Sequence, residues 1–367
     1  MAGNPVFTEA LSLVQQGKTA ALSTIVSSKG SLPMSKKAKM LVRPDGKIVG
    51  TVGGGCLEAD VWAEARHVME TGIPSLQKFI LTEKHAGENG LNCGGNVEVF
   101  TEPLLPGVAD EMLSAIVKVH AARTSAVLAT RVLGGAFQNL PNKLLVYPDG
   151  RTLGSLGFAG ADACVLEEVK GLEAIPEQFL KVIDWSEGDR AFQIFLESIC
   201  PEPTLYLFGG GHVSLAIAQI AQMVGFRIVV IDDRPAFANK ERFPMASETL
   251  TLDMETAFEH LEIDDLSYVV AVTRGHQHDK PVVAQAVKTA AAYIGMIGSR
   301  RKIALMWRQL EAEGIPREVL NRVHAPIGLD IGADTPEEIA VSIVSELICM
   351  RRLQGQHDQE VQSLSVL

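Results

Sequence analysis

The sequence has few cysteines, no long apolar run and no surplus of basic residues. Its five cysteines are Cys56, Cys93, Cys164, Cys200 and Cys349. An odd, scattered set of this kind argues against a disulfide framework and is typical of reduced thiols in a cytoplasmic protein. No apolar stretch reaches the length of a membrane span, and Met1–Thr8 lacks the basic-then-apolar order of a signal peptide.

Basic residues are outnumbered, because 33 Lys and Arg stand against 44 Asp and Glu, a formal net charge of -11 at pH 7. No broad basic face is therefore available for a phosphate backbone, and nucleic acid is not an expected partner. The hydrophobic share of 47% and charged share of 21% are typical of a globular protein. We expect a cytoplasmic protein of two or three domains, without membrane or nucleic-acid partners.

The first half of the chain contains an internal repeat. Ala20–Thr24 resembles Ala126–Thr130, and Lys39–Gly46 resembles Lys143–Gly150. Each copy carries Pro-Asp-Gly between apolar runs, which predicts a hairpin turn because proline presets φ and glycine accepts positive φ.

A helix is expected after each hairpin, over 57–70 and 161–169. The two copies, 20–70 and 126–170, predict an N-terminal mixed α/β domain with a degenerate internal repeat. In the second copy Gly157–Gly160 stands where the first has its glycines and Cys56. We therefore expect the first copy to carry the chemistry.

The first domain is expected to span 1–195. A helix-like pattern over Asp189–Ile199 runs into Cys200-Pro201-Glu202-Pro203, and two prolines so close together end a helix. We predict a second domain over 203–353 and a tail over 354–367. In the second domain short apolar strands alternate with helices, at 205–208, 227–231, 248–252, 268–272 and 293–297. Such alternation predicts a doubly wound parallel sheet.

The first of these strands leads into a glycine-rich turn, formed by Gly209, Gly210, Gly211 and His212. A helix follows, and the next strand ends in Asp232, about 20 residues on, as expected for a ribose-binding acid. This order predicts a Rossmann-like nucleotide site, and the alternative is a tight turn without a ligand. Arg234 either meets a 2′-phosphate or lies in solvent, so the choice between NAD and NADP stays open.

Polar residues follow two further strands and are expected at the same sheet edge, where ligands bind in open parallel sheets. They are Thr273, Gly275, His276, His278, Asp279, Ser299, Arg300, Arg301 and Lys302. We assign Thr273, Gly275, Asp279, Ser299 and Arg300 to cofactor binding. His276 is a candidate acid or base. For His276 and His278 together we favour hydrogen-bonding or acid/base roles, and the alternative is a metal pair. Arg301 and Lys302 either bind an anion or are solvated.

Two cysteines lie beside glycines in the first domain. Cys56 follows Gly53, Gly54 and Gly55 at an expected helix start, where a thiolate is stabilised, and Glu58 is placed to orient a ligand. Cys93 lies in a second glycine-rich loop. Both thiols suit a soft metal or sulfur, and the alternative is that both are small core residues at tight turns. The lysines of Ser35–Lys39 either attract an anion or are solvated.

Taken together, these blocks resemble the XdhC/CoxI family of accessory proteins for molybdenum hydroxylases. The resemblance covers nearly the whole chain. It rests on Lys39–Glu58, Cys93–Gly95, Gly209–His212, Asp232–Pro235, Thr273–Asp279, Gly295–Lys302, Pro326–Leu329 and Pro336–Ala340.

The resemblance implies a protein that binds molybdenum cofactor, favours its sulfurated form and delivers it to an apo molybdenum hydroxylase such as xanthine dehydrogenase. It also implies contact with a cysteine desulfurase, and we expect a homodimer. Cys56 and Cys93 would then meet the molybdenum of the cargo, its dithiolene or the sulfur in transit. The glycine turn of the second domain would hold either a dinucleotide such as NAD(P) or the cofactor's own pterin phosphate or nucleotide extension. A second hypothesis is an NAD(P)-dependent oxidoreductase, in which the thiols are structural.

Overall fold

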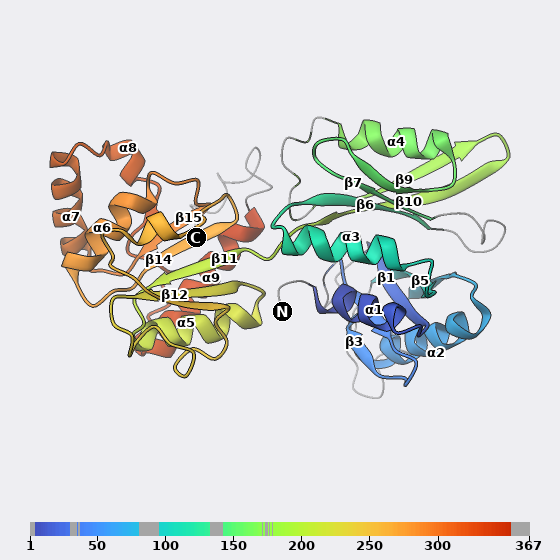
Figure 1. Ribbon diagram of the computed structural model, residues 1–367, viewed down its shortest axis with the longest axis horizontal. Coiled ribbons are helices and arrows are strands. Elements are labelled where there is room, and N and C mark those ends of the chain that lie inside the picture. Colours follow the sequence, from blue (N-terminus) through green and yellow to red (C-terminus); the bar gives the residue numbers. More distant parts are fainter. Residues whose placement is uncertain are drawn as a thin grey trace. The chain divides into compact units, whose positions relative to one another are not determined.

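The computed structural model describes residues 4–29, 35, 37–80, 95–132, 142–170, 172, 175, 177 and 179–353. The chain divides into two compact units, Met1–Pro201 (unit 1) and Glu202–Leu367 (unit 2). Each unit has its own sheets (Figure 1). Each unit also has its own apolar core.

Unit 1 contains the same order of elements twice. The first copy consists of α1 (Pro5–Gln15), β1 (Ala20–Lys29), β2 (Lys39–Val42), β3 (Ile48–Gly50), α2 (Gly55–Thr71), β4 (Ser75–Ile80) and β5 (Asn96–Leu104). The second consists of α3 (Asp110–Ala121), β6 (Ala126–Val132), β7 (Lys143–Val146), β8 (Thr152–Ser155), α4 (Ala159–Val169), β9 (Leu180–Glu187) and β10 (Arg190–Ile199). The repeat is therefore longer than the 20–70 and 126–170 that sequence similarity reveals.

Each copy forms a five-stranded antiparallel sheet with the same strand order, β3-β2-β1-β5-β4 and β8-β7-β6-β10-β9. The predicted Pro-Asp-Gly hairpins are confirmed, because β2 pairs with β3 and β7 with β8. Helix α2 covers one face of the first sheet with Leu57, Val61, Ala65 and Val68, the apolar stripe that the sequence predicts. Helix α4 covers the second sheet in the same way.

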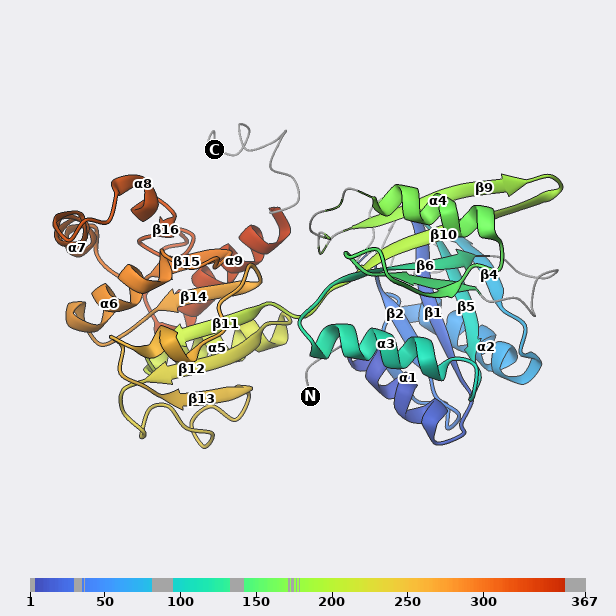
Figure 2. The same cartoon turned by 45° about the horizontal axis from the view of Figure 1, so that its top comes forward.

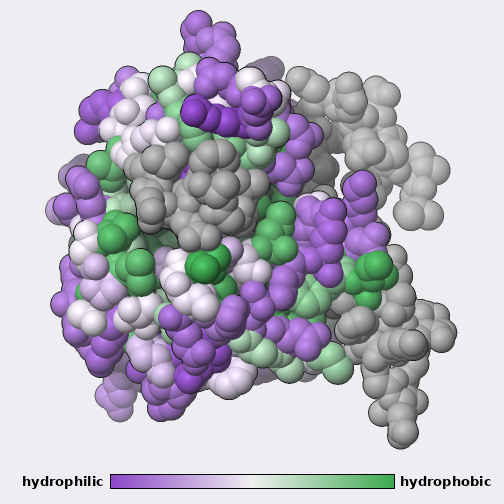
Figure 3. Space-filling model, turned by 90° about the vertical axis from the view of Figure 1, so that its right-hand side faces the viewer, coloured by the Kyte–Doolittle hydropathy of each residue, from purple (hydrophilic) through white to green (hydrophobic). Residues whose placement is uncertain are grey.

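Helices α1 and α3 pack together and join the two copies in one core. This core contains Phe7 and Leu13 of α1, Ile116 of α3, and Leu22 and Leu128 of the central strands β1 and β6. Apolar side chains outside the core are scattered among hydrophilic ones on the face of the molecule in Figure 3. The duplicated unit thus buries one apolar core between its two halves, in addition to the cores under α2 and α4.

The helix predicted over Asp189–Ile199 is wrong, because Arg190–Ile199 is strand β10. It pairs with β6 on one side and β9 on the other. Phe192 and Ile194 face the core under α4, whereas Phe195 faces the opposite layer. A central strand covered on both faces loses its alternation of apolar and polar residues, so its sequence looks like that of a buried helix.

Unit 2 is a six-stranded parallel sheet with the order β13-β12-β11-β14-β15-β16 (Figure 2). The strands are β11 (Thr204–Phe208), β12 (Arg227–Asp232), β13 (Glu248–Thr251), β14 (Ser267–Ala271), β15 (Tyr293–Met296) and β16 (Val323–His324). The helices are α5 (His212–Met223), η3 (Ala257–His260), α6 (His276–Ala286), α7 (Arg300–Ala312), α8 (Arg317–Leu320) and α9 (Pro336–Leu353).

Helices cover both faces of this sheet. Ile217 of α5 and Ile343 of α9 belong to one core, and Val283 of α6 and Met306 of α7 belong to the other. The arrangement confirms the predicted α/β class and the doubly wound, Rossmann-like second domain. None of the helices in the described part of the chain has the length and apolar character that crossing a bilayer requires.

Candidate functional site

The glycine turn of the first copy is supported by a short hydrogen-bonded chain. The Thr51 hydroxyl donates to the Glu58 carboxylate and accepts from the backbone N–H of Gly53 at 3.0 Å. Gly53, Gly54 and Gly55 have φ of 124°, 77° and 65°, a region that side chains with a Cβ rarely adopt. Glu58 therefore holds the turn in shape.

The second copy builds the same support. Ser155 Oγ donates to Asp162 Oδ2 at 2.7 Å and accepts from the backbone N–H of Gly157 at 2.9 Å. Ser155 and Asp162 thus correspond to Thr51 and Glu58. Because an acid supports the glycine turn in both copies, the presence of a carboxylate at Glu58 is explained by the structure of the turn.

The two copies differ in the residues that the scaffold presents. The second copy has Phe158, whose buried ring lies 5.6 Å from Trp185 and 5.5 Å from Phe192 between ring centroids. Gly54 takes this position in the first copy, and a Cβ added there has no neighbour within 4 Å among the described residues. Among the described residues, the space next to Gly54 is therefore empty at the position where the second copy has an aromatic side chain.

An open groove of about 660 Å³ borders this turn in unit 1. The groove is lined by Asn4 at the start of α1, by Lys37 and Lys39 of the basic segment, and by Gly53 and Gly54 of the turn. Asn4 caps α1 by accepting from Val6 N at 3.0 Å, but within the described residues no side chain caps α2 at Gly54. The first N–H groups of α2 are therefore available to an anion.

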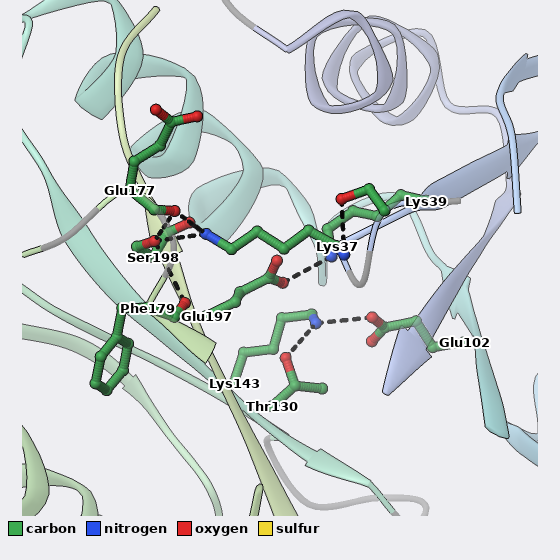
Figure 4. Close-up of polar contacts among 10 residues, drawn as sticks. Lys37, Lys39, Glu102, Thr130, Lys143, Glu177, Phe179, Glu197 and Ser198 are labelled. Carbon is green, nitrogen blue, oxygen red and sulfur yellow. Dashed lines mark hydrogen bonds and ion pairs between the residues drawn. The ribbon is translucent and has the colours of Figure 1, made fainter. Parts of the chain in front are cut away.

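Lys37 and Lys39, which line the groove, direct their ammonium groups to the second copy (Figure 4). Lys37 Nζ donates to Ser198 Oγ and to the carbonyl oxygen of Glu177, and burial lowers the pKa of Lys37. Lys39 Nζ lies 2.7 Å from Glu197 Oε1, and both side chains are buried. These two lysines are thus neither solvated nor free to hold an anion.

Cys56 lies in the first turn of α2, as the sequence predicts, and it is exposed. Cys93 falls within 81–94, outside the described residues. In the part of the chain that is described, no three His, Cys, Asp or Glu side chains are grouped to hold a metal ion. A joint role for the two thiols stays a prediction.

The glycine turn of unit 2 connects β11 to α5. A Cβ on Gly209 would lie 2.5 Å from Val272 O, and one on Gly210 would clash with Phe237 O. Gly211 has open space around it within the described structure and precedes exposed His212 at the start of α5. Two glycines are required by packing, and the third leaves the helix start accessible to a phosphate.

Asp232 ends β12, as predicted, but its carboxylate already has protein partners. Oδ2 accepts from Gly210 N at 2.7 Å, and Oδ1 accepts from Arg234 N at 3.0 Å and Nε at 2.8 Å. Arg234 Nη2 donates to Oδ2 at 3.0 Å. Burial opposes the charged carboxylate, but these hydrogen bonds outweigh it and lower the pKa of Asp232. Through its bond to Gly210 N, the carboxylate of Asp232 holds the glycine turn in place.

On the other side of the turn, the predicted residues Thr273 and Asp279 form a partly buried network with Lys302, whose role the sequence leaves open. Asp279 Oδ1 accepts from the Thr273 hydroxyl at 2.5 Å, and its Oδ2 accepts from Lys302 Nζ at 2.7 Å. Asp279 is fully buried, so Lys302 is paired rather than solvated. Ser299 caps α7 by accepting from Lys302 N at 3.3 Å, and Arg300 is exposed.

Gly275 and His276 mark the start of α6. The side chain of His276 is outside what the structure describes, so its acid or base role stays a prediction. Sequence reasoning missed Arg242, whose Nε donates to the carbonyl oxygen of Gly210 at 2.8 Å. No local pattern signals this contact, because the loop after β12 must fold back onto the turn to make it.

The protein is thus a two-unit α/β protein, in which a duplicated unit with a glycine turn is joined to a Rossmann-like unit. Two family models match the chain and together cover more than half of it: "XdhC Rossmann domain" over residues 205–347 and "XdhC and CoxI family" over residues 13–79. The chain belongs to the XdhC and CoxI family.

The chain is also similar to curated proteins over most of its length. The uncharacterized protein YqeB of Escherichia coli K12 is 28% identical over 94% of this chain, which spans only 46% of YqeB. A Bacillus subtilis 168 protein named as a probable xanthine dehydrogenase subunit is 26% identical, with 93% of this chain and 96% of that protein covered. The molybdenum cofactor insertion chaperone PaoD of Escherichia coli K12 is 23% identical, with 93% and 86% covered.

A crystal structure described as a xanthine dehydrogenase from Bacillus halodurans is similar to this chain with a TM-score of 0.77. It is 24% identical in sequence, and the match covers 96% of this chain and 98% of that one. At this identity the similarity shows a shared fold.

Proposed function

We propose that this protein is a maturation factor that binds molybdenum cofactor and delivers it to an apo molybdenum hydroxylase of the xanthine dehydrogenase type. The observation that carries the proposal is the pair of turns in unit 1. The same Thr/Ser and acid scaffold holds Phe158 in one copy and an open Gly54 with exposed Cys56 in the other. Relatives named as a cofactor insertion chaperone and as a xanthine dehydrogenase subunit support it.

The chemistry of the open turn suits this cargo. A cysteine thiolate is a soft ligand of the kind that binds molybdenum, its dithiolene or a sulfur atom. The N–H groups at the start of α2, which no described side chain caps, favour an anion such as a phosphate on the cargo. In the proposal Cys56 contacts the molybdenum or its sulfur, and Cys93 assists. The support comes from residue type and position at the turn.

The proposal extends to sulfuration and to partners. A cysteine desulfurase supplies the sulfur while the cargo is bound, and the loaded protein then docks transiently on the apo-hydroxylase. Such contacts are of modest area and partly polar. We further propose a homodimer, on the family resemblance alone.

The test mixes the purified full chain, molybdenum cofactor, a sulfur donor and an apo molybdenum hydroxylase, and follows hydroxylase activity. Cys56→Ala should still bind the apo-enzyme but raise its activity no more than a reaction without the protein. Cys164→Ala, on α4 of the second copy, is the matched control and should act like the parent. If Cys56→Ala activates fully, the thiol mechanism is wrong, and if the parent fails to activate, delivery is wrong.

The open Gly211 turn supports a second candidate, an NAD(P)-dependent oxidoreductase that uses unit 2. The two functions differ in turnover. An oxidoreductase consumes reduced nicotinamide with a small substrate, whereas a maturation factor binds ligands without consuming them. The near-ultraviolet absorbance of reduced nicotinamide, which the oxidised form lacks, falls only if the nicotinamide is consumed and so separates the two functions.

A further inference from the structure

We propose that the glycine turn of unit 2 binds a dinucleotide with a 2′-phosphate, NADP(H) rather than NAD(H), and that Arg234 determines this preference. The inference concerns unit 2 and goes beyond cargo delivery, which rests on the open turn of unit 1. It follows from the partners of Asp232 and from the position of two arginines at the turn.

The dinucleotide has a place to bind its pyrophosphate. Gly211 precedes α5 with open space around it, and within the described residues no side chain caps this helix. The N–H groups of the first turn, with the positive end of the helix dipole, attract a phosphate at this position. This part of the site is common to NAD and NADP and does not distinguish them.

Asp232 is poorly suited to NAD. In NAD sites the acid at the end of the second strand accepts from the 2′-hydroxyl of the ribose. Here the carboxylate is 1% exposed and is already bonded to Gly210 N and to three donors of Arg234. A ribose hydroxyl would have to displace a guanidinium from a buried carboxylate, which is unfavourable because the charge would lose its partner.

Arg234 can bind a phosphate and still keep its hydrogen bonds to Asp232. A guanidinium has five N–H donors, and the contacts to Asp232 use Nε and one N–H of Nη2. The side chain is 30% exposed, and its Cζ lies 3.6 Å from the centroid of the Phe237 ring, which fixes the plane of the fork. Three donors remain, and of these one on Nη1 and one on Nη2 lie side by side, so that they can bond two oxygens of a phosphate.

A second guanidinium adds positive charge at the same turn. Arg242 Nε donates to Gly210 O at 2.8 Å, and its Cζ lies 5.4 Å from the Phe237 ring centroid. Its Nη2 is buried and finds no hydrogen-bond partner within the described chain. Positive charge with an unsatisfied donor raises the local potential and favours the extra charge of a 2′-phosphate.

The test is calorimetry on the full chain with two matched pairs of ligands, NADP⁺ with NAD⁺ and adenosine 2′,5′-bisphosphate with 5′-AMP. In each pair we expect the ligand with the 2′-phosphate to bind at least about tenfold more tightly, as a charge-assisted, forked contact provides. Equal affinities, tighter binding of NAD⁺, or no binding at millimolar ligand would overturn the proposal.

Variants assign the preference to its residue. Arg234→Ala should remove the advantage of NADP⁺, and Arg234→Lys should retain only part of it, because lysine lacks the fork. Arg274→Ala is the control. Arg274 is an exposed residue of the loop after β14 and lies 3.7 Å from Asp233, and its loss should leave the preference for NADP⁺ unchanged. An equal effect of both alanine variants would contradict a specific role for Arg234.

Hydroxylase activation is measured separately, so failure of the nucleotide preference and failure of cargo delivery are distinguishable. A protein that prefers NADP⁺ but activates no hydroxylase keeps this inference and loses the proposed function. The reverse result keeps delivery and removes the 2′-phosphate site.

Discussion

Lys39 of the first copy and Glu197 of the second form an ion pair of 2.7 Å in which each side chain is 4% exposed. Lys143 makes the reciprocal pair with Glu102, also at 2.7 Å (Figure 4). The two lysines have equivalent places, opposite Thr24 and Thr130 in their sheets. Each copy therefore neutralises a buried charge of the other, which ties the halves of unit 1 together.

Removing one member of such a pair should be costly. Lys39→Met leaves Glu197 buried without its counter-charge, and we expect a loss of about 3–5 kcal/mol in the free energy of unfolding. The double variant Lys39→Met/Glu197→Leu should recover most of it. Urea unfolding of the full chain, followed by circular dichroism, measures both. Lys170→Ala, in an exposed pair with Glu167, is the control and should cost less than about 1 kcal/mol.

Two equivalent glycines should tolerate no side chain. Gly50 and Gly154 have φ of 82° and 83°, and a Cβ on either would clash with the carbonyl oxygen of Lys39 or Lys143. We expect Gly50→Ala and Gly154→Ala to cost about 2–5 kcal/mol from strain and overlap. Gly17 has φ of 72° but open space around it within the described structure. Gly17→Ala should therefore show the cost of backbone strain alone, about 1–2 kcal/mol. Equal losses at all three positions in thermal unfolding would contradict the packing argument.

Glu346 should make unit 2 sensitive to acid. Burial opposes its charge, but His324 Nδ1 at 2.7 Å, the Tyr293 hydroxyl at 2.7 Å and Gly328 N at 2.7 Å outweigh burial and lower its pKa. A lowered folded pKa adds stability above the unfolded value of about 4.3, and this stability is lost as pH falls through the folded pKa.

Glu346→Gln should therefore cost about 1–3 kcal/mol at pH 7, and the difference from the parent should shrink below about pH 4. Denaturant titrations at several pH values measure the difference. The exposed Glu255→Gln is the matched control and should show little change at any pH. A difference independent of pH would mean that the ionised form of Glu346 is not what stabilises the unit.

The cysteines should differ in their rates of alkylation. Cys56 is exposed, whereas Cys164, Cys200 and Cys349 are partly buried, and burial raises the pKa of Cys200. Of these four we expect Cys56 to react first with iodoacetamide. Cys200 should react at least about tenfold more slowly than Cys56, since the thiolate is the reactive form. Peptide mapping by mass spectrometry gives each rate, and unfolded protein, in which all thiols are exposed, is the control. A faster Cys200 would contradict its burial.

Local patterns of the sequence predict much of the fold. The stripe Leu57, Val61 and Ala65 lies on the buried face of α2, because helical periodicity needs only the residues of one element. The turn at Gly209–Gly211 lies between a strand and a helix for the same reason. The two-residue strand β16 escapes prediction, since it is too short to carry a pattern.

Longer-range relationships are beyond such patterns. The sequence of strand β10 predicts a helix because pairing with β6 and β9 buries both faces of the strand. The sequence leaves Lys37 open between an anion contact and solvation, and in the folded chain it binds Ser198, which lies far along the chain. Contacts of this kind depend on which segments the fold brings together.

The sequence by itself determined the fold class, the family and the two glycine turns, because turn chemistry and periodicity are written into neighbouring residues. Only the tertiary structure decided which charges are free at those turns. Asp232 is closed by Arg234 and Gly210, and Lys39 is neutralised by Glu197. The physical reason is burial: a charge removed from water must find a partner, and folding alone selects which partner lies within reach.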